Sequence, residues 1–214
     1  VVAAGDNQTA TVGQALGAPL VAKLADNAGD VREAGIALTF HIESGSAHFG
    51  GPTDTLRVDT IIATDAQGRA SVTPYLGRGA GPVRVTVSGA GLAGSATFTA
   101  TGQPQVASRL SFRTQPTTTG AGEVFAPTVE VALLDPLGNV ATTSTRTITI
   151  ALTPSANPGG ATLRGTLAAA TVNGVAQFAD LSMVELGTGY TLTASAAGTP
   201  ALAALARNPF TIGP

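Results

Sequence analysis

The sequence predicts an all-β fold that consists of two antiparallel β-sandwiches in tandem. Apolar residues alternate with polar ones at a period of two, which is typical of half-buried strands, and helical periodicity is nearly absent. Clusters of Gly, Pro, Asn and Asp follow the apolar runs about every 8 to 15 residues, as the turns of a sandwich do. A turn motif also occurs twice, because Asp26 to Val31 returns 109 residues later as Asp135 to Val140.

The repeat defines two domains. Both turns follow an Ala-Pro pair and a short apolar run, and the Gln67-Gly68 turn returns 106 residues later as Asn173-Gly174. Solenoid units repeat every 20 to 50 residues or so, whereas a period near one hundred suits a small domain. We therefore expect domains at residues 1–103 and 104–214, divided near Pro104, whose ring should restrict the angle between them more than a Gly/Ser tether would.

Strands can be placed in order along the chain. In the first half, residues that are expected to face inward and outward alternate along segments 20–25, 36–43 and 83–88. Phe40 falls on an inward position. Segment 196–206 is rich in Ala, but Gly198 and Pro200 favour a loop or irregular strand over a helical turn. In the second half, the residues expected to face inward are Val129, Val131, Leu133, Ile148, Ile150, Leu152, Ala176, Phe178, Tyr190, Leu192, Ala194, Phe210 and Ile212.

Composition excludes several classes of function. Charged residues make up 11% of the 214 residues and the formal net charge is -2, so nucleic acid is not expected as a partner. The absence of Cys removes thiol catalysis, disulfides and Cys-based zinc sites. No run of 18 apolar residues is present, so membrane insertion is not expected either. We interpret the chain as a piece of a longer protein whose targeting signal lies elsewhere.

The candidate polar sites are weak. His41 and His48 are the only histidines, and both are expected at the surface, the first on the outward side of a strand and the second in a Gly/Ser loop. The alternative is that they form a shared metal site or a catalytic pair. Ser44 and Ser46 lie near them, but this spacing does not define a catalytic triad. We therefore assign no catalytic residue and no cofactor-binding residue.

Three groups of residues could bind a metal ion or a ligand, but each also has a structural interpretation. The turns at Asp26, Asp30 and Asp135 offer oxygens for Ca²⁺, although Asp at the start of a turn is already explained by side-chain hydrogen bonds to the backbone. The Gly-rich segment 77–81 precedes a strand rather than opening a helix, which argues against a phosphate site. Tyr75 with Phe49 and nearby Arg residues offers a small carbohydrate platform, but scattered aromatics more often pack within a sandwich. We assign no metal ligand and no cofactor.

Most of residues 1–101 resemble the group 1 bacterial immunoglobulin-like domains of invasin- and intimin-type surface proteins. The resemblance rests on segments 5–13, 19–31, 36–40, 64–70 and 91–100, and the segment 43–62 departs from it. The second half is similar to a related bacterial immunoglobulin-like repeat, on segments 109–116, 157–163 and 187–194. The resemblance implies two tandem immunoglobulin-like sandwiches with no catalytic residue, located extracellularly or at the cell surface.

The implied function is a non-catalytic structural or adhesive module that acts as an extended spacer and presents other domains. Its partners would be neighbouring immunoglobulin-like domains of the same or adjacent chains. One alternative is a module that binds a glycan or protein through the segment 43–62. Another is a subunit of an extracellular filament or virion decoration, because sandwiches can lend a strand to a neighbour's exposed edge.

Overall fold

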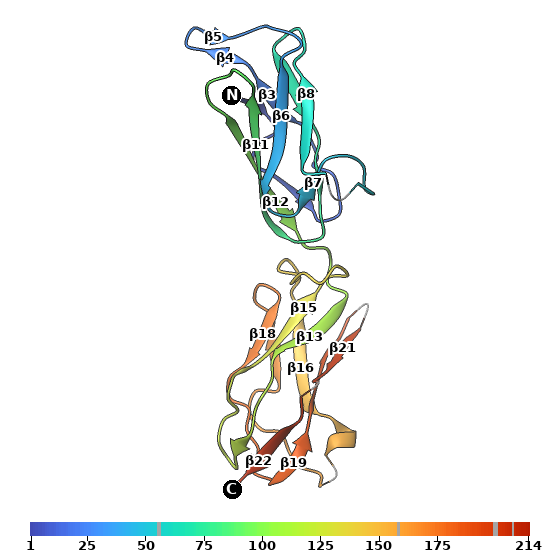
Figure 1. Cartoon of the computed structure of the whole chain (residues 1–214). Coiled ribbons are helices and arrows are strands. Elements are labelled where there is room, and N and C mark those ends of the chain that lie inside the picture. Colours follow the sequence, from blue (N-terminus) through green and yellow to red (C-terminus); the bar gives the residue numbers. More distant parts are fainter. Residues whose placement is uncertain (55–56, 158, 199–200, 207) are drawn as a thin grey trace. The chain divides into compact units, whose positions relative to one another are not determined.

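The computed structural model describes residues 1–54, 57–157, 159–198, 201–206 and 208–214. Two compact units divide the chain, Val1–Pro104 and Gln105–Pro214. This division falls one residue after the boundary predicted from the sequence, and independent folding of each unit stays a prediction. We describe each unit by itself (Figure 1).

The first unit has two main sheets. Strand order in the smaller sheet is β1-β3-β9, and in the larger sheet it is β2-β12-β11-β6-β8. Two short pairs, the β4-β5 hairpin and β7-β10, lie outside these sheets. The strands are β1 (Val2–Ala4), β2 (Gln8–Thr11), β3 (Leu20–Lys23), β4 (Ala25–Asp26), β5 (Gly29–Asp30), β6 (Ala37–Ser44), β7 (Ala47–His48), β8 (Asp59–Ala63), β9 (Arg69–Val72), β10 (Tyr75–Leu76), β11 (Gly81–Gly89) and β12 (Ala96–Gln103).

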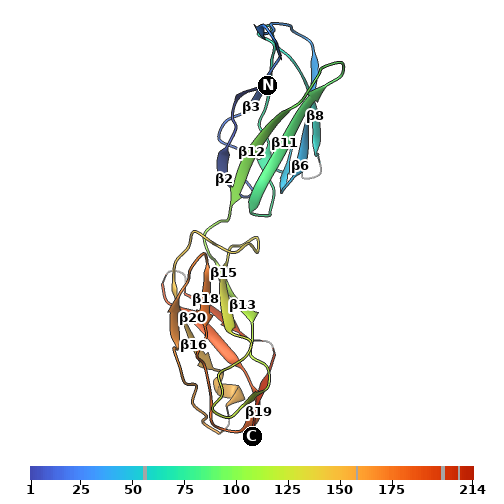
Figure 2. The same cartoon turned by 90° about the vertical axis from the view of Figure 1, so that its left-hand side faces the viewer.

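The N-terminal segment of this unit crosses from one sheet to the other. β1 pairs antiparallel with β3, and β2 then pairs parallel with β12, beside which it lies in Figure 2. Gly5, with a φ of 85°, lies in the crossing, where a Cβ atom would stand 2.1 Å from the carbonyl oxygen of Pro19. Glycine is required here because both the left-handed backbone and the close approach exclude a side chain.

The second unit repeats this plan. The sheet β13-β15-β18 corresponds to β1-β3-β9, and β14 pairs parallel with β22 as β2 does with β12. The remaining strands form β14-β22-β19 and β17-β16-β20-β21. The elements are β13 (Arg109–Thr114), β14 (Thr119–Gly120), β15 (Val129–Leu134), β16 (Thr147–Leu152), η1 (Pro154–Ala156), β17 (Ala168–Ala170), β18 (Val175–Phe178), β19 (Gly187–Tyr190), β20 (Leu192–Ala196), β21 (Leu202–Leu205) and β22 (Phe210–Gly213).

The predicted all-β, immunoglobulin-like fold class is therefore confirmed by strand order and strand direction. The short 3-10 turn η1 is the one helical piece among the described residues. None of those residues forms a helix that is long and apolar enough to cross a membrane.

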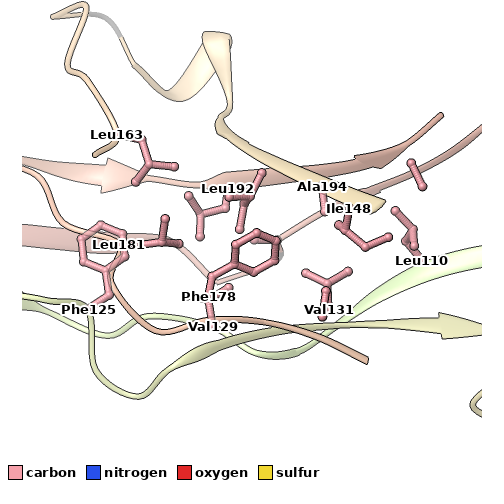
Figure 3. Close-up of a cluster of buried hydrophobic side chains, with 14 of the residues drawn as sticks. Leu110, Phe125, Val129, Val131, Ile148, Leu163, Phe178, Leu181, Leu192 and Ala194 are labelled. Carbon is pink, nitrogen blue, oxygen red and sulfur yellow. The ribbon is translucent and has the colours of Figure 1, made fainter. Parts of the chain in front are cut away.

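Each unit has its own cluster of buried hydrophobic residues. Phe40 is fully buried in the first unit, with its ring centroid 6.5 Å from that of Phe98. Phe178 is 1% exposed and occupies the middle of the second cluster, among side chains from several strands (Figure 3). The prediction that Phe40 and Phe178 anchor the cores is confirmed, because strand alternation fixes which face each residue occupies.

Two details differ from simple alternation, and a third concerns the Ala-rich segment. Ala132 is fully buried although it lies between the buried residues Val131 and Leu133. The alternating run through Tyr190 and Leu192 is divided between β19 and β20, which pair with β22 and β16 respectively. The Ala-rich segment supplies the end of β20 and, at residues 202–205, the edge strand β21, in line with the irregular strand expected there.

Candidate functional site

The candidate site is built by the segment that leaves β6 at Ser44 and returns to β8 at Asp59. This segment includes the short strand β7 and an exposed turn at residues 50–54. β7 pairs with β10, so His48 lies opposite Tyr75. Residues 55–56 of the segment lie outside the described part of the chain.

Phe49 holds this segment against the core. Its side chain is 1% exposed, and its backbone N–H donates to the Arg57 carbonyl at 2.7 Å. Burial of a phenyl ring supplies about 1.5 to 3 kcal/mol of favourable transfer free energy, which favours packing of this part of the segment on the core. Phe49 is therefore a core residue and not part of an exposed carbohydrate platform.

His48 is buried, which corrects the prediction that it lies at the surface. Its side chain is 4% exposed and stacks on Tyr75, with ring centroids 5.8 Å apart and an interplanar angle of 15°. Nδ1 of His48 accepts or donates no hydrogen bond among the described residues. Burial could not be read from the sequence, because it depends on the pairing of β7 with a strand 27 residues away along the chain.

His41 is exposed, as predicted, and does not meet His48. Its Nδ1 atom lies 2.7 Å from Oδ1 of Asp59 on the neighbouring strand β8. On the same face, Nε of Arg84 donates to Oε2 of Glu43 at 2.8 Å. Such exposed pairs contribute about 0 to 1 kcal/mol to stability, so they mark a solvated sheet face.

The serines and the Gly-rich segment form a local structural contact. Oγ of Ser46 accepts a hydrogen bond from the Gly79 N–H at 3.1 Å, which fastens segment 77–81 to the beginning of the loop. Ser44 ends β6 and is exposed. The two serines and two histidines are therefore distributed over different contacts and do not form a nucleophile and base pair.

The acidic turns hold backbone N–H groups. Oδ1 of Asp26 accepts from the N–H groups of Ala28 at 2.8 Å and Gly29 at 3.0 Å, while Asp30 pairs with Lys23. Asp135 is fully buried and accepts from Leu137, Asn139 and Gln105. Among the described residues no three His, Cys, Asp or Glu side chains gather as metal ligands would.

Hydrogen bonding sets the ionisation of Asp135. Burial alone would raise the pKa of its carboxyl, but the Asn139 side chain and the N–H groups of Gln105, Asn139 and Leu137 outweigh burial and lower the pKa. In the first unit, hydrogen bonds from Thr99 and Asn7 likewise lower the pKa of Asp6. Both carboxylates are structural acceptors.

A groove also lies in the second unit beside β13 and β21. It has a volume of about 640 Å³ and contains no ionisable side chain among the residues that line it. β13 has a register shift between Phe112 and Thr114, and Thr191 lies between β19 and β20. The lining residues are Leu110, Ser111, Phe112, Gln115, Thr191, Ala204 and Ala206.

No family model matches the sequence, and no curated protein matches it. Among solved structures, the chain is similar to the D0-D1 domain of intimin, with 16% identity, a TM-score of 0.38, and coverage of 98% of this chain and 96% of that one. It is also similar to invasin, a bacterial integrin-binding protein, with 20% identity, a TM-score of 0.39, and coverage of 100% and 38%. A glycosyl hydrolase family 2 member from Bacteroides cellulosilyticus has 12% identity and a TM-score of 0.43, with coverage of 95% and 23%.

The chain thus spans nearly all of the intimin fragment but well under half of the other two proteins. All three TM-scores are below 0.5, so the function of this chain has to be inferred from its own residues.

Proposed function

We propose that this chain is a non-catalytic structural or adhesive module of a large bacterial surface or secreted protein, where it acts as an extended spacer that presents other domains. The observation that carries this proposal is the direction of the second and the last strand of each unit. β2 runs parallel to β12, and β14 runs parallel to β22. The backbone of each unit therefore enters at one end and leaves at the opposite end, which suits a bead in a linear array.

The polar candidates support a structural role. Asp6, Asp26 and Asp135 are engaged by backbone N–H groups within their own units. His41 pairs with Asp59 on an exposed sheet face, and His48 packs on Tyr75. A catalytic site needs a nucleophile or base oriented by further groups around a space for substrate. The described residues supply no such arrangement.

Solution scattering tests the spacer role. A compact protein of this length would have a radius of gyration of about 17 Å. We expect a value on the order of 22 Å or more with an elongated distance distribution, because the short linker carries Pro104 and each unit is traversed end to end. A value near the compact figure would contradict the spacer role and favour a binding module.

A binding module is the second candidate, and the exposed turn at residues 50–54 favours it. This turn follows Phe49, which is buried in the core, and its own residues are exposed. A glycan array or a host-protein panel probed with the chain, and with a variant in which residues 51–54 are replaced by Gly-Ser repeats, would test it. Binding that is lost in the variant while thermal unfolding is unchanged would support this candidate.

The proposed partners are neighbouring immunoglobulin-like domains of the same or adjacent chains, and the proposed location is extracellular or at the cell surface. Strand β8 is the edge of its sheet and carries Ile61, which is 66% exposed. An exposed edge with an apolar side chain is the feature that assembly by strand pairing would use. Sedimentation of the wild-type chain and an Ile61→Lys variant would reveal such assembly as a difference in mass.

A further inference from the structure

Strand β8 forms a border of the larger sheet in the first unit, and it lacks the features that usually protect such a border. In the described part of the chain it pairs with β6 alone, beside which it lies in Figure 1. Its register is continuous over Asp59–Ala63, and this stretch contains no Pro and no Lys. Sheet edges are usually protected by such residues, by bulges or by being very short. β8 is therefore a regular strand with an open edge.

The backbone hydrogen bonds show which groups of β8 point outward. Just beyond the strand, the N–H of Thr64 donates to the Ile36 carbonyl at 2.9 Å. Hydrogen-bonded and non-hydrogen-bonded residue pairs alternate along an antiparallel ladder, so the even-numbered residues of β8 are those that bond to β6. The N–H and C=O groups of Asp59, Ile61 and Ala63 therefore point away from β6.

Ile61 is the apolar centre of this edge. Its side chain is 66% exposed, and Asp59 and Ala63 are exposed on the same face. Asp59 carries the one charge of the strand, and its Oδ1 lies 2.7 Å from Nδ1 of His41 in the same unit. Nε of Arg57 donates to the Asp59 carbonyl at 3.2 Å, and a carbonyl oxygen can accept a second hydrogen bond. The edge thus offers backbone donors and acceptors on both sides of an exposed isoleucine.

Two other sheet borders do not have this combination. Strand β17 occupies the equivalent border of the second unit, because the order β17-β16-β20-β21 matches β8-β6-β11-β12. It consists of the three alanines Ala168–Ala170. β2, at the opposite border of the sheet that contains β8, has only Gln, Thr and Ala side chains. Of these three borders, β8 is the longest and the one with a large exposed aliphatic side chain.

We propose that two copies of this chain pair through β8, antiparallel to each other about a twofold axis at Ile61. The two isoleucines then lie opposite each other in a hydrogen-bonded pair, and Asp59 of each copy lies opposite Ala63 of the other. A twofold interface uses the same surface on both copies, as this one does. The inference rests on the proposed partnership with adjacent chains and names the partner as a second copy of this chain.

Charge selects the register. An axis at Asp59 would place the two Asp59 carboxylates opposite each other, and an axis at Ile62 would place Asp59 opposite Asp65. Like charges directly opposite each other destabilise a strand pair. With the axis at Ile61, Asp59 faces an alanine, and Arg57 of one copy lies opposite Asp65 of the other. The charges are then complementary across the axis.

The exposed isoleucine selects the same register. An axis at Thr60 would place Ile61 opposite Asp59, and an axis at Ala63 would place it opposite Asp65. Both arrangements would bring a carboxylate against an apolar side chain, which is unfavourable because the charge loses water. The axis at Ile61 removes both isoleucines from water together. It is therefore the register in which the edge is complementary to itself.

The interface is small, because five residues of each copy pair. Interfaces that bury less than about 1,200 Å² in total are typical of transient complexes. We therefore expect a weak dimer that forms at high protein concentration. Copies held close together in an array would reach such a concentration locally.

Analytical ultracentrifugation of the whole chain from micromolar to millimolar concentration tests the proposal. The wild-type chain should shift from monomer to dimer, and Ile61→Lys should stay monomeric because two ammonium groups would face each other. Leu186→Lys is the matched control, since Leu186 in the second unit is 60% exposed, and it should dimerise as the wild type does. Circular dichroism and thermal unfolding establish that both variants are folded.

Hydrogen exchange measured at low and high concentration identifies the paired edge. The amides of Asp59, Ile61 and Ala63 should exchange more slowly at high concentration, because they become hydrogen-bonded in the dimer. The amides of Thr60 and Ile62 already bond to β6 and should change little.

Disulfide formation tests the register, because the chain contains no Cys of its own. Residues opposite each other in a hydrogen-bonded pair have Cα atoms about 5.5 Å apart, within the range of a disulfide. Ile61→Cys should therefore give a covalent dimer on air oxidation catalysed by copper phenanthroline. Ala63→Cys should not, because its two sulfur-bearing residues would be about 13 Å apart along the strands.

Several results would overturn the proposal. One is a wild-type chain that stays monomeric at millimolar concentration, and another is a dimer that Ile61→Lys forms equally well. Loss of the dimer in Leu186→Lys would place the contact in the second unit, and cross-linking of Ala63→Cys as efficient as that of Ile61→Cys would reject the register. Solution scattering of monomeric Ile61→Lys tests the spacer role separately, so a failure of the dimer leaves that role standing.

Discussion

Asp6 and Thr99 join the two ends of the first unit across 93 residues of sequence. Oδ1 of Asp6 accepts the Thr99 backbone N–H at 2.7 Å and the Thr99 hydroxyl at 3.0 Å. Asp6 lies where the N-terminal segment crosses between sheets, and Thr99 lies in the middle of β12. One carboxylate therefore holds the crossing in place.

Replacement of Asp6 by Ala should lower the free energy of unfolding of the first unit by about 1 to 3 kcal/mol, because a partly buried N–H loses a charged acceptor. Denaturant unfolding in a Tyr190→Phe background measures this, since Tyr75 is then the single tyrosine and reports on the first unit. Asp54→Ala is the matched control and should have little effect. Equal stability of the two variants would mean that the crossing does not depend on Asp6.

Acid should destabilise both units below about pH 4. The pKa values of Asp6 and Asp135 are lowered in the folded protein by hydrogen bonds, so each contributes stability that is present above the unfolded-state pKa of about 3.9. This contribution is lost as pH falls through the lower folded-state pKa values. Thermal unfolding between pH 2 and 7 measures the change, and an Asp6→Asn, Asp135→Asn double variant should show a flatter profile. A profile as steep as that of the wild type would assign the acid sensitivity to other carboxylates.

Truncation of a buried aromatic side chain should reduce the stability of either unit. Phe40→Ala and Phe178→Ala should each lower the free energy of unfolding by about 3 to 5 kcal/mol, because each removes a fully packed ring. Thr147, which is exposed on the outward phase of β16, provides the control, and Thr147→Ala should change stability by less than about 0.5 kcal/mol. Similar losses at Thr147 and Phe40 would contradict the assigned strand faces.

A chelator should leave the melting temperature unchanged. The carboxylates of Asp26, Asp30 and Asp135 already have hydrogen-bond or ion-pair partners within their own unit. Differential scanning calorimetry with EDTA, compared with added Ca²⁺, measures any dependence on metal. A large fall in melting temperature with EDTA would contradict this expectation and favour a calcium site at Asp26, Asp30 and Asp135.

Most strand faces could be predicted from sequence, because burial on one side of a sheet imposes a strict alternation that Phe40 and Phe178 display directly. The crossing at Gly5 and Asp6 could not be predicted, because Thr99, the partner of Asp6, is remote in sequence. The local residues indicate only a turn. The burial of His48 was missed for a similar reason. Its Gly and Ser neighbours are typical of an exposed loop, and only pairing with Tyr75 places the ring inside.

The parallel pairing of β2 with β12 also determines how the first unit bears load. A pull on its two ends in opposite directions acts along both strands, because the chain enters through one and leaves through the other. The hydrogen bonds of the register from Gln8 opposite Ala100 to Thr11 opposite Gln103 are then stressed together in shear instead of opening one after another. Resistance to such a pull is set by the unfolding rate under force. The pairing of the short strand β2 with β12 is therefore expected to determine the mechanical stability of the first unit.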